Sequence, residues 1–140
     1  MIKILFLCIH NSARSQMAEA YLKKFGADKF LAESAGLEAG ALNPLAVEVM
    51  KEDGIDISSN KTKSVFDFFN ESRAYDYVVT VCDEASAARC PVFPGVHKKI
   101  NWCFEDPSAF TGTREQKMEA TRKVRDKIKA AVQSLVNELG

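Results

Sequence analysis

The chain has 140 residues, of which 46% are hydrophobic and 27% are charged, as is usual for a soluble globular protein. Its 19 basic and 19 acidic residues balance to a formal net charge of zero, which argues against nucleic acid or an anionic membrane surface as a partner. No apolar run approaches the roughly 18 residues of a membrane span, and the N-terminus does not resemble a signal peptide, so we expect a cytoplasmic protein. The length predicts a single domain over residues 1–140.

Apolar runs and helical stripes alternate along the chain. In order, we expect a strand over 2–8, a helix over 15–26, a strand over 29–36, a helix over 43–54, a short helix over 64–72, strands over 75–82 and 98–104, and a helix over 113–139. Asn43 before Pro44 is a typical helix start, and Thr113 with Gln116 predicts a capping box. Strands alternating with helices indicate an α/β domain, so we expect a four-stranded parallel sheet flanked by helices on both faces.

The predicted sheet brings reactive residues to one edge. In such sheets, ligands bind beyond the carboxyl ends of the strands. Cys8 ends the first expected strand, Cys82 ends the third, and Asp106 lies just past the fourth. We therefore expect these three residues to meet, although they are far apart in the sequence.

The residues after the first strand predict an anion site. The segment from Cys8 reads CIHNSARS, and a loop of this length before a helix can turn successive backbone N–H groups inward around a tetrahedral anion. Arg14 can hold two oxygens of that anion at once. The same positive field favours a thiolate, so Cys8 is expected to be a nucleophile. The predicted oxyanion-binding loop comprises Ile9, His10, Asn11, Ser12, Ala13, Arg14 and Ser15.

The polar residues of this loop have several possible roles. Ser12 and Ser15 can donate hydrogen bonds to the Cys8 sulfur or to the loop itself. Asn11 suits a left-handed turn or a bond across the loop. The imidazole of His10 either tunes the charge of the loop or only packs and faces solvent.

The sequence allows two interpretations for several other candidate residues. Asp106, in an Asp-Pro pair, is either a general acid or the cap of a turn or helix. Cys82 and Cys90 are either a redox pair or two unrelated free thiols. Cys103 falls inside an expected strand and is interpreted as a packing residue. The spacing of cysteines and histidines does not fit structural zinc.

Four stretches carry a family resemblance: FLCIHNSARSQMAEA, AESAG, VVTVCDEASAARCP and NWCFEDP. Together they resemble the low-molecular-weight protein tyrosine phosphatase superfamily over nearly the whole chain, and within it the arsenate reductases that are coupled to thioredoxin. The resemblance implies a flavodoxin-like fold of the low-molecular-weight phosphatase type, with an oxyanion loop after the first strand.

The resemblance also implies a reaction. Cys8 would attack arsenate, and Asp106 would protonate the leaving oxygen. Cys82 would then attack Cys8 in the thiol–arsenic adduct and expel arsenite, and Cys90 would attack Cys82 in turn. Thioredoxin would reduce the final disulfide, and the outcome would be arsenic detoxification. The segment 83–89 is expected to be less stable than the core, so that the two later sulfurs can meet.

The resemblance raises expectations about ions and partners. Some relatives hold a potassium ion, and Asn11, Glu19 and Ser34 match three of its ligand positions, whereas Ser64 stands in place of a carboxylate. No other cofactor is expected. The expected state is a monomer that binds arsenate, phosphate-like oxyanions and thioredoxin.

Two other functions use the same loop and thiols. A phosphatase of this superfamily would hydrolyse phosphomonoesters, but Gln16 replaces its usual proline, and no aromatic residue directly follows Pro107. A thiol-based sensor would react once and signal through a partner. We rank arsenate reductase first because two additional thiols accompany the loop.

Overall fold

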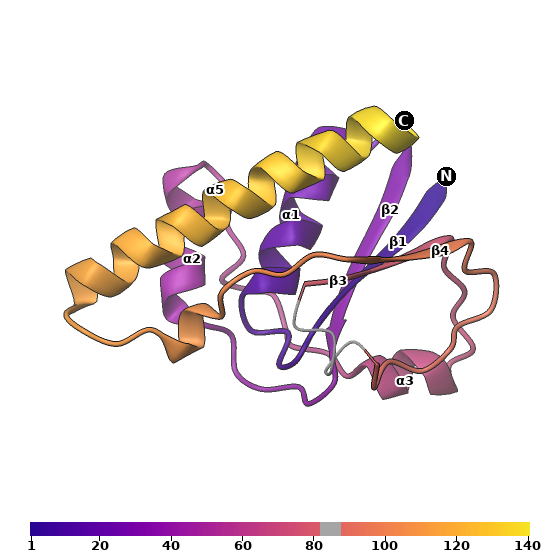
Figure 1. Ribbon diagram of the computed structural model, residues 1–140, viewed down its shortest axis with the longest axis horizontal. Coiled ribbons are helices and arrows are strands. Elements are labelled where there is room, and N and C mark those ends of the chain that lie inside the picture. Colours follow the sequence, from indigo (N-terminus) through magenta and orange to yellow (C-terminus); the bar gives the residue numbers. More distant parts are fainter. Residues whose placement is uncertain (82–87) are drawn as a thin grey trace.

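The computed structural model describes residues 1–81 and 88–140. Its elements are β1 (Ile2–Cys8), α1 (Arg14–Gly26), β2 (Phe30–Gly36), α2 (Pro44–Glu52), α3 (Val65–Asn70), β3 (Tyr77–Thr80), β4 (Lys98–Asn101), the 3-10 helix η1 (Pro107–Ala109) and α5 (Arg114–Leu139) (Figure 1). The four strands form one parallel sheet in the order β2-β1-β3-β4. The predicted α/β fold with a four-stranded parallel sheet is therefore confirmed.

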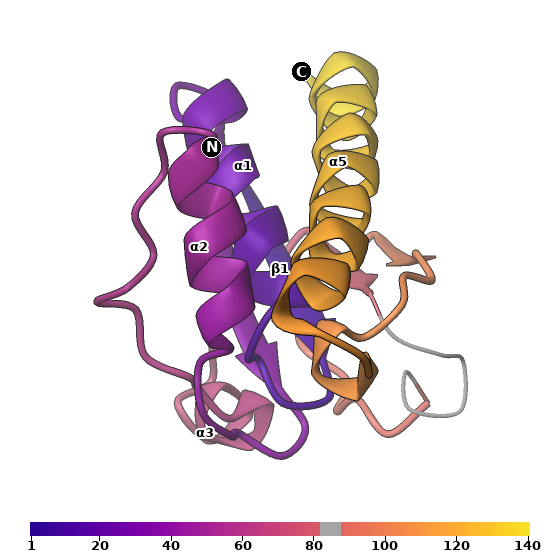
Figure 2. The same ribbon diagram turned by 90° about the vertical axis from the view of Figure 1, so that its left-hand side faces the viewer.

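Helices cover both faces of the sheet. Helices α1, α2 and α5 pack together on one face, as Figures 1 and 2 show, and α3 lies on the other face with part of the chain between β3 and β4. Strand β1 contributes side chains to the cores on both faces of the sheet, because successive side chains of a strand point to opposite sides. Ile4 and Phe6 enter the core under α1, whereas Leu5 and Leu7 enter the core next to α3. All four are fully buried, which explains the continuous apolar run at this central strand.

The helix caps follow the sequence closely. Asn43 Oδ1 accepts a hydrogen bond from Leu45 N at 2.8 Å, and α2 then begins at Pro44. Thr113 and Gln116 form the expected capping box at the start of α5. Among the helices that the structure describes, none combines the length and the apolar character that crossing a membrane requires.

Two strands are shorter than predicted. The strands expected over 75–82 and 98–104 have four residues each. Since β4 pairs only with β3, and their pairing ends at Thr80 and Asn101, the chain beyond Asn101 has no neighbouring strand to follow. Cys103 therefore lies outside the sheet and is exposed, so its interpretation as a packing residue is wrong.

Candidate active site

The loop that follows β1 is shaped by the segment 37–43. Four loop carbonyls accept hydrogen bonds from backbone N–H groups of this segment: those of Cys8, Ile9, His10 and Ser12, at 3.1, 2.7, 3.1 and 2.9 Å. In a planar trans peptide, the carbonyl and the next N–H point in opposite directions. The N–H groups of residues 9, 10, 11 and 13 therefore point away from the segment 37–43, toward the inside of the loop. Inward N–H groups of this kind bind anions.

Gly36 makes this curvature possible. It is the last residue of β2 and pairs with Cys8 in the sheet. A Cβ atom at this position would lie 2.7 Å from Asn11 N and 2.7 Å from Ile9 O. Both contacts are with backbone atoms, which cannot move aside cheaply. Only glycine lets the loop come this close to the strand.

The Cys8 sulfur lies among hydrogen-bond donors inside the loop. Cys8 is 2% exposed, and its Sγ lies 3.0 Å from Asn11 N and 2.8 Å from Ser15 Oγ. Asn11 Nδ2 donates to Ser15 Oγ at 2.7 Å, which leaves the Ser15 hydroxyl proton free to point at the sulfur. Hydrogen bonds donated to a sulfur favour its charged form. This arrangement suits a thiolate nucleophile.

Asn11 is the centre of this network. Its φ of 55° is left-handed, as the sequence led us to expect. Its Oδ1 accepts from Gln16 Nε2 and from Lys63 N, both at 3.0 Å. These two donors fix the amide orientation, so that Nδ2 faces Ser15 and Ser34.

Sequence reasoning missed the structural role of Gln16, which is fully buried and also donates to Lys61 O at 3.0 Å. Gln16 lies between Ser15 and Met17 in the first turn of α1, and the side chains around it are buried as well. A buried amide without hydrogen-bond partners is costly, so this position points to an internal contact.

Arg14 joins the loop to the segments that follow β3 and β4. Its Nη1 donates to Val81 O at 3.3 Å and to Phe104 O at 3.2 Å. Its Nη2 lies 3.6 Å from Asp106 Oδ2. The structure thus brings Asp106 next to Arg14 beside the loop, a contact that was not predicted from the sequence. The expected meeting of Cys8, Cys82 and Asp106 stays a prediction, because Cys82 lies outside the described residues.

Asp106 has two contacts of different kinds. Its Oδ1 accepts from Ser108 N at 3.0 Å and caps η1, whereas its Oδ2 faces Arg14. Asn43 Nδ2 donates to Ser108 Oγ at 3.0 Å, which ties η1 to the start of α2. The capping role is therefore present, and the second oxygen is left to face the site.

His10 lies on the outer side of the loop. Its Nδ1 is 2.9 Å from the carbonyl oxygen of Glu38, and its ring lies against Gly40. The imidazole thus packs against the segment 37–43.

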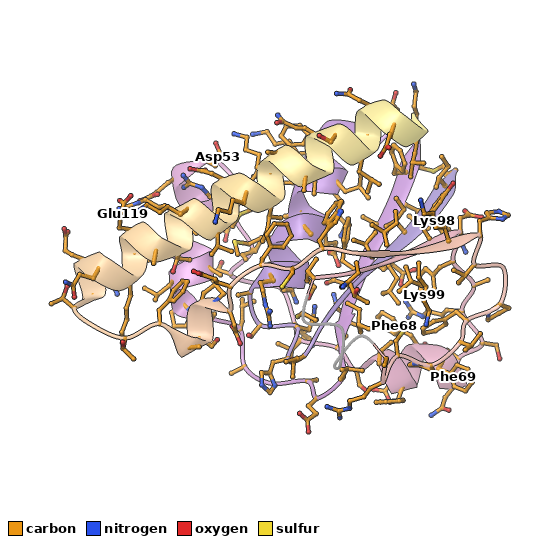
Figure 3. All side chains as sticks on the ribbon, in the orientation of Figure 1. Asp53, Phe68, Phe69, Lys98, Lys99 and Glu119 are labelled. Atoms are coloured by element: carbon orange, nitrogen blue, oxygen red, sulfur yellow. The ribbon has the colours of Figure 1, made fainter. Side chains whose placement is uncertain are left out.

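Cys90 lies apart from the loop, in the apolar layer next to α3. It is 6% exposed, and burial raises the pKa of its thiol, although the charge of Lys99 opposes this effect. Figure 3 shows Lys99 on the α3 side of β4. Cys82 lies outside the described residues, and so does most of the segment 83–89, so the expectations for both stay predictions.

The residues at the candidate potassium position do not fit that ion. Both donors on Asn11 Oδ1 occupy the amide oxygen that an ion would need. The other two expected ligands face an ammonium group, because Lys63 Nζ lies 3.4 Å from Glu19 Oε1 and 3.4 Å from Ser34 Oγ. Ser64 instead caps α3 through Phe66 N. Outside residues 82–87, no three His, Cys, Asp or Glu side chains gather where they could hold a metal ion.

The fold and the loop define a class: α/β proteins with a candidate oxyanion loop after the first strand of a parallel sheet. The chain matches the family described as low molecular weight phosphotyrosine protein phosphatase over residues 3–140, and it belongs to this family. An arsenate reductase of Bacillus subtilis (strain 168) is 47% identical to it over 125 residues, which are 89% of this chain and 88% of that protein. The resemblance seen in the sequence is therefore confirmed.

Solved structures agree with this assignment. A structure described as an arsenate reductase in the phosphate binding state has a TM-score of 0.81 and 33% identity, with 100% of both chains covered. A thioredoxin-dependent arsenate reductase of Corynebacterium glutamicum has a TM-score of 0.65 and 28% identity, with 95% of this chain and 62% of that chain covered. The fold predicted from the sequence is thus the fold of these proteins.

Proposed function

We propose that this protein reduces arsenate to arsenite by a relay of three thiols, with thioredoxin as the reductant. The observation that supports this most directly is the environment of the Cys8 sulfur, which lies 3.0 Å from Asn11 N and 2.8 Å from Ser15 Oγ in a loop whose carbonyls are bound by the segment 37–43. The similar proteins named above are arsenate reductases, one of which is described as thioredoxin-dependent.

The first step is a displacement at arsenic. The loop N–H groups and Arg14 hold the arsenate oxygens while the Cys8 thiolate attacks arsenic. A sulfur–arsenic bond forms and an arsenic–oxygen bond breaks. Asp106 gives a proton to the leaving oxygen, which departs as water. The position of Asp106 beside Arg14 supports this role.

The second step moves two electrons to arsenic. The Cys82 thiolate attacks the Cys8 sulfur, and a disulfide forms while the electron pair of the sulfur–arsenic bond passes to arsenic. Arsenic falls from the pentavalent to the trivalent state and leaves as arsenite. Cys90 then attacks Cys82, which frees the Cys8 thiolate and leaves a Cys82–Cys90 disulfide. The two thiols of thioredoxin reduce that disulfide, a cycle that suits the reducing cytoplasm and serves arsenic detoxification.

A coupled assay tests the proposal. The protein is incubated with arsenate, thioredoxin, thioredoxin reductase and NADPH, and we expect NADPH oxidation that depends on arsenate. Cys8→Ser and Cys82→Ser abolish it, whereas Cys90→Ser still gives about one turnover because its thiol acts only in recycling. Cys103→Ser is the matched control and retains activity, because Cys103 is exposed outside the sheet. Failure of the wild-type protein with a compatible thioredoxin would reject the proposal.

A phosphatase is the second candidate, because the same loop fits a phosphate group and the family is named for phosphotyrosine phosphatases. The two functions differ in their need for the later thiols. Turnover of an aryl phosphate that is robust and unchanged in the Cys82→Ser/Cys90→Ser variant would favour the phosphatase. Weak phosphatase activity in a protein that also reduces arsenate would not favour the phosphatase, since a loop of this kind binds both oxyanions.

A further inference from the structure

A buried carboxylate lies behind the loop. The Glu19 side chain is 6% exposed, and burying a charge of this kind is costly unless it is paired. Two ammonium groups pair with it: Lys23 Nζ lies 2.9 Å from Oε2, and Lys63 Nζ lies 3.4 Å from Oε1. The two lysines differ in exposure, because the Lys23 side chain is 61% exposed and that of Lys63 is 33% exposed.

Only one of these lysines reaches the sulfur network. Lys63 Nζ also lies 3.4 Å from Ser34 Oγ, which accepts from Asn11 Nδ2 at 3.0 Å. The same Nδ2 donates to Ser15 Oγ, and Ser15 lies against the Cys8 sulfur. A continuous series of contacts therefore runs from the Lys63 ammonium to Cys8.

The backbone of Lys63 fixes where its side chain begins. Its N–H donates to Asn11 Oδ1 at 3.0 Å, and its carbonyl accepts from Gly36 N at 2.8 Å. Both bonds survive when the side chain is changed. A substitution at this position therefore tests the ammonium group and leaves the anchor of the loop in place.

We propose that the Lys63 ammonium is a built-in cation that takes the place of a monovalent metal ion and positions Asn11 and Ser15 around Cys8. An ammonium group and a potassium ion both seek several oxygen atoms, and here Glu19 Oε1 and Ser34 Oγ face the ammonium. Lys63 is a positioning residue, since it acts on Cys8 through Ser34, Asn11 and Ser15. The proposal rests on the proposed function only in taking Cys8 as the nucleophile.

The test measures Cys8 itself and does not use arsenate turnover, so it can fail independently of the proposed function. In a Cys82→Ser/Cys90→Ser/Cys103→Ser background, Cys8 is the sole thiol. Its rate of alkylation by iodoacetamide and the midpoint of thermal unfolding are measured in potassium chloride and in tetramethylammonium chloride at equal ionic strength. With Lys63 unchanged, we expect both values to be the same in the two salts.

Three variants separate the positioning role from simple charge. In tetramethylammonium chloride, Lys63→Met lowers the alkylation rate about tenfold, since a charged donor to the network is lost. Lys63→Arg keeps the charge and stays within about threefold of the parent. Lys23→Met is the matched control, because it removes the other partner of Glu19 but no contact to Ser34. We expect potassium to restore Lys63→Met at most in part, because Glu19 and Ser34 line the vacated space but Asn11 Oδ1 keeps both of its donors.

A loss specific to Lys63→Met, with or without restoration by potassium, supports the proposal, provided that the parent is indifferent to the salt. The proposal is overturned if potassium speeds alkylation in the parent, or if Lys63→Met behaves like the parent or like Lys23→Met. Should Lys63→Met not fold, Lys63→Gln, which removes the charge but keeps a polar side chain, takes its place with the same expected loss.

Discussion

Replacing Asn11 with alanine removes the centre of the loop network. Four buried side-chain hydrogen bonds are lost: those to Ser15 and Ser34, and those from Gln16 and Lys63. At about 1 kcal/mol for each net hydrogen bond, the loss is about 4 kcal/mol. Alanine at a φ of 55° adds about 1 kcal/mol of backbone strain. We therefore expect Asn11→Ala to lower the free energy of unfolding by about 5 kcal/mol, out of the roughly 5–15 kcal/mol of a typical domain.

Urea unfolding of the variant and the wild-type protein measures this loss. Asn70→Ala is the matched control, because Asn70 is exposed at the end of α3 and its substitution changes stability by at most about 0.5 kcal/mol. Alkylation of Cys8 provides a second readout, which falls because Ser15 is no longer oriented toward the sulfur. A loss below about 2 kcal/mol together with an unchanged alkylation rate would refute the reasoning that Asn11 holds the loop.

Further substitutions test Gly36 and Asp106 at the loop, and a pH profile tests Cys90 in the layer next to α3. Gly36→Ala forces a Cβ against the backbone of Asn11; it costs about 1–3 kcal/mol and weakens phosphate binding in isothermal titration. Asp106→Asn keeps the cap of η1 but removes the acid, so arsenate turnover falls about 100-fold while η1 stays folded; an unchanged rate would exclude Asp106 as the acid. Since burial raises the pKa of Cys90 and the thiolate is the reacting form, its alkylation needs a higher pH than that of a cysteine in a short unfolded peptide; equal pH profiles by mass spectrometry would contradict this.

The sequence was sufficient for the features that depend on local patterns. The strand that ends at Cys8, the helix behind it and the caps at Asn43 and Thr113 each follow from a few adjacent residues. Topology predicted that Asp106 lies at the edge of the sheet where Cys8 ends its strand, because parallel strands place their carboxyl ends at one edge. It did not predict that Arg14 would be the partner of Asp106 there.

Features that depend on contacts between distant segments could not be predicted in this way. Lys63 reads as an ordinary surface lysine until β2 and the start of α3 bring it next to Glu19. The end of β4 is set by the length of its partner β3. The apolar run through Cys103 therefore predicted a strand longer than the four residues that pair. Gln16 carried a local signal, but its partners Asn11 and Lys61 become visible only in the folded chain.

The segment 37–43 has a consequence for how this protein can vary. It holds the loop by main-chain atoms, and the groups that it turns inward are main-chain atoms too. Every amino acid except proline carries an amide N–H, so the half-buried side chains at positions 9 and 10 can be replaced without removing an N–H group from the loop, whereas Ala13 is held by its burial in the core. The position that cannot change is Gly36, because any side chain there would meet the backbone of the loop. A search for functional positions that considers only reactive side chains would miss it.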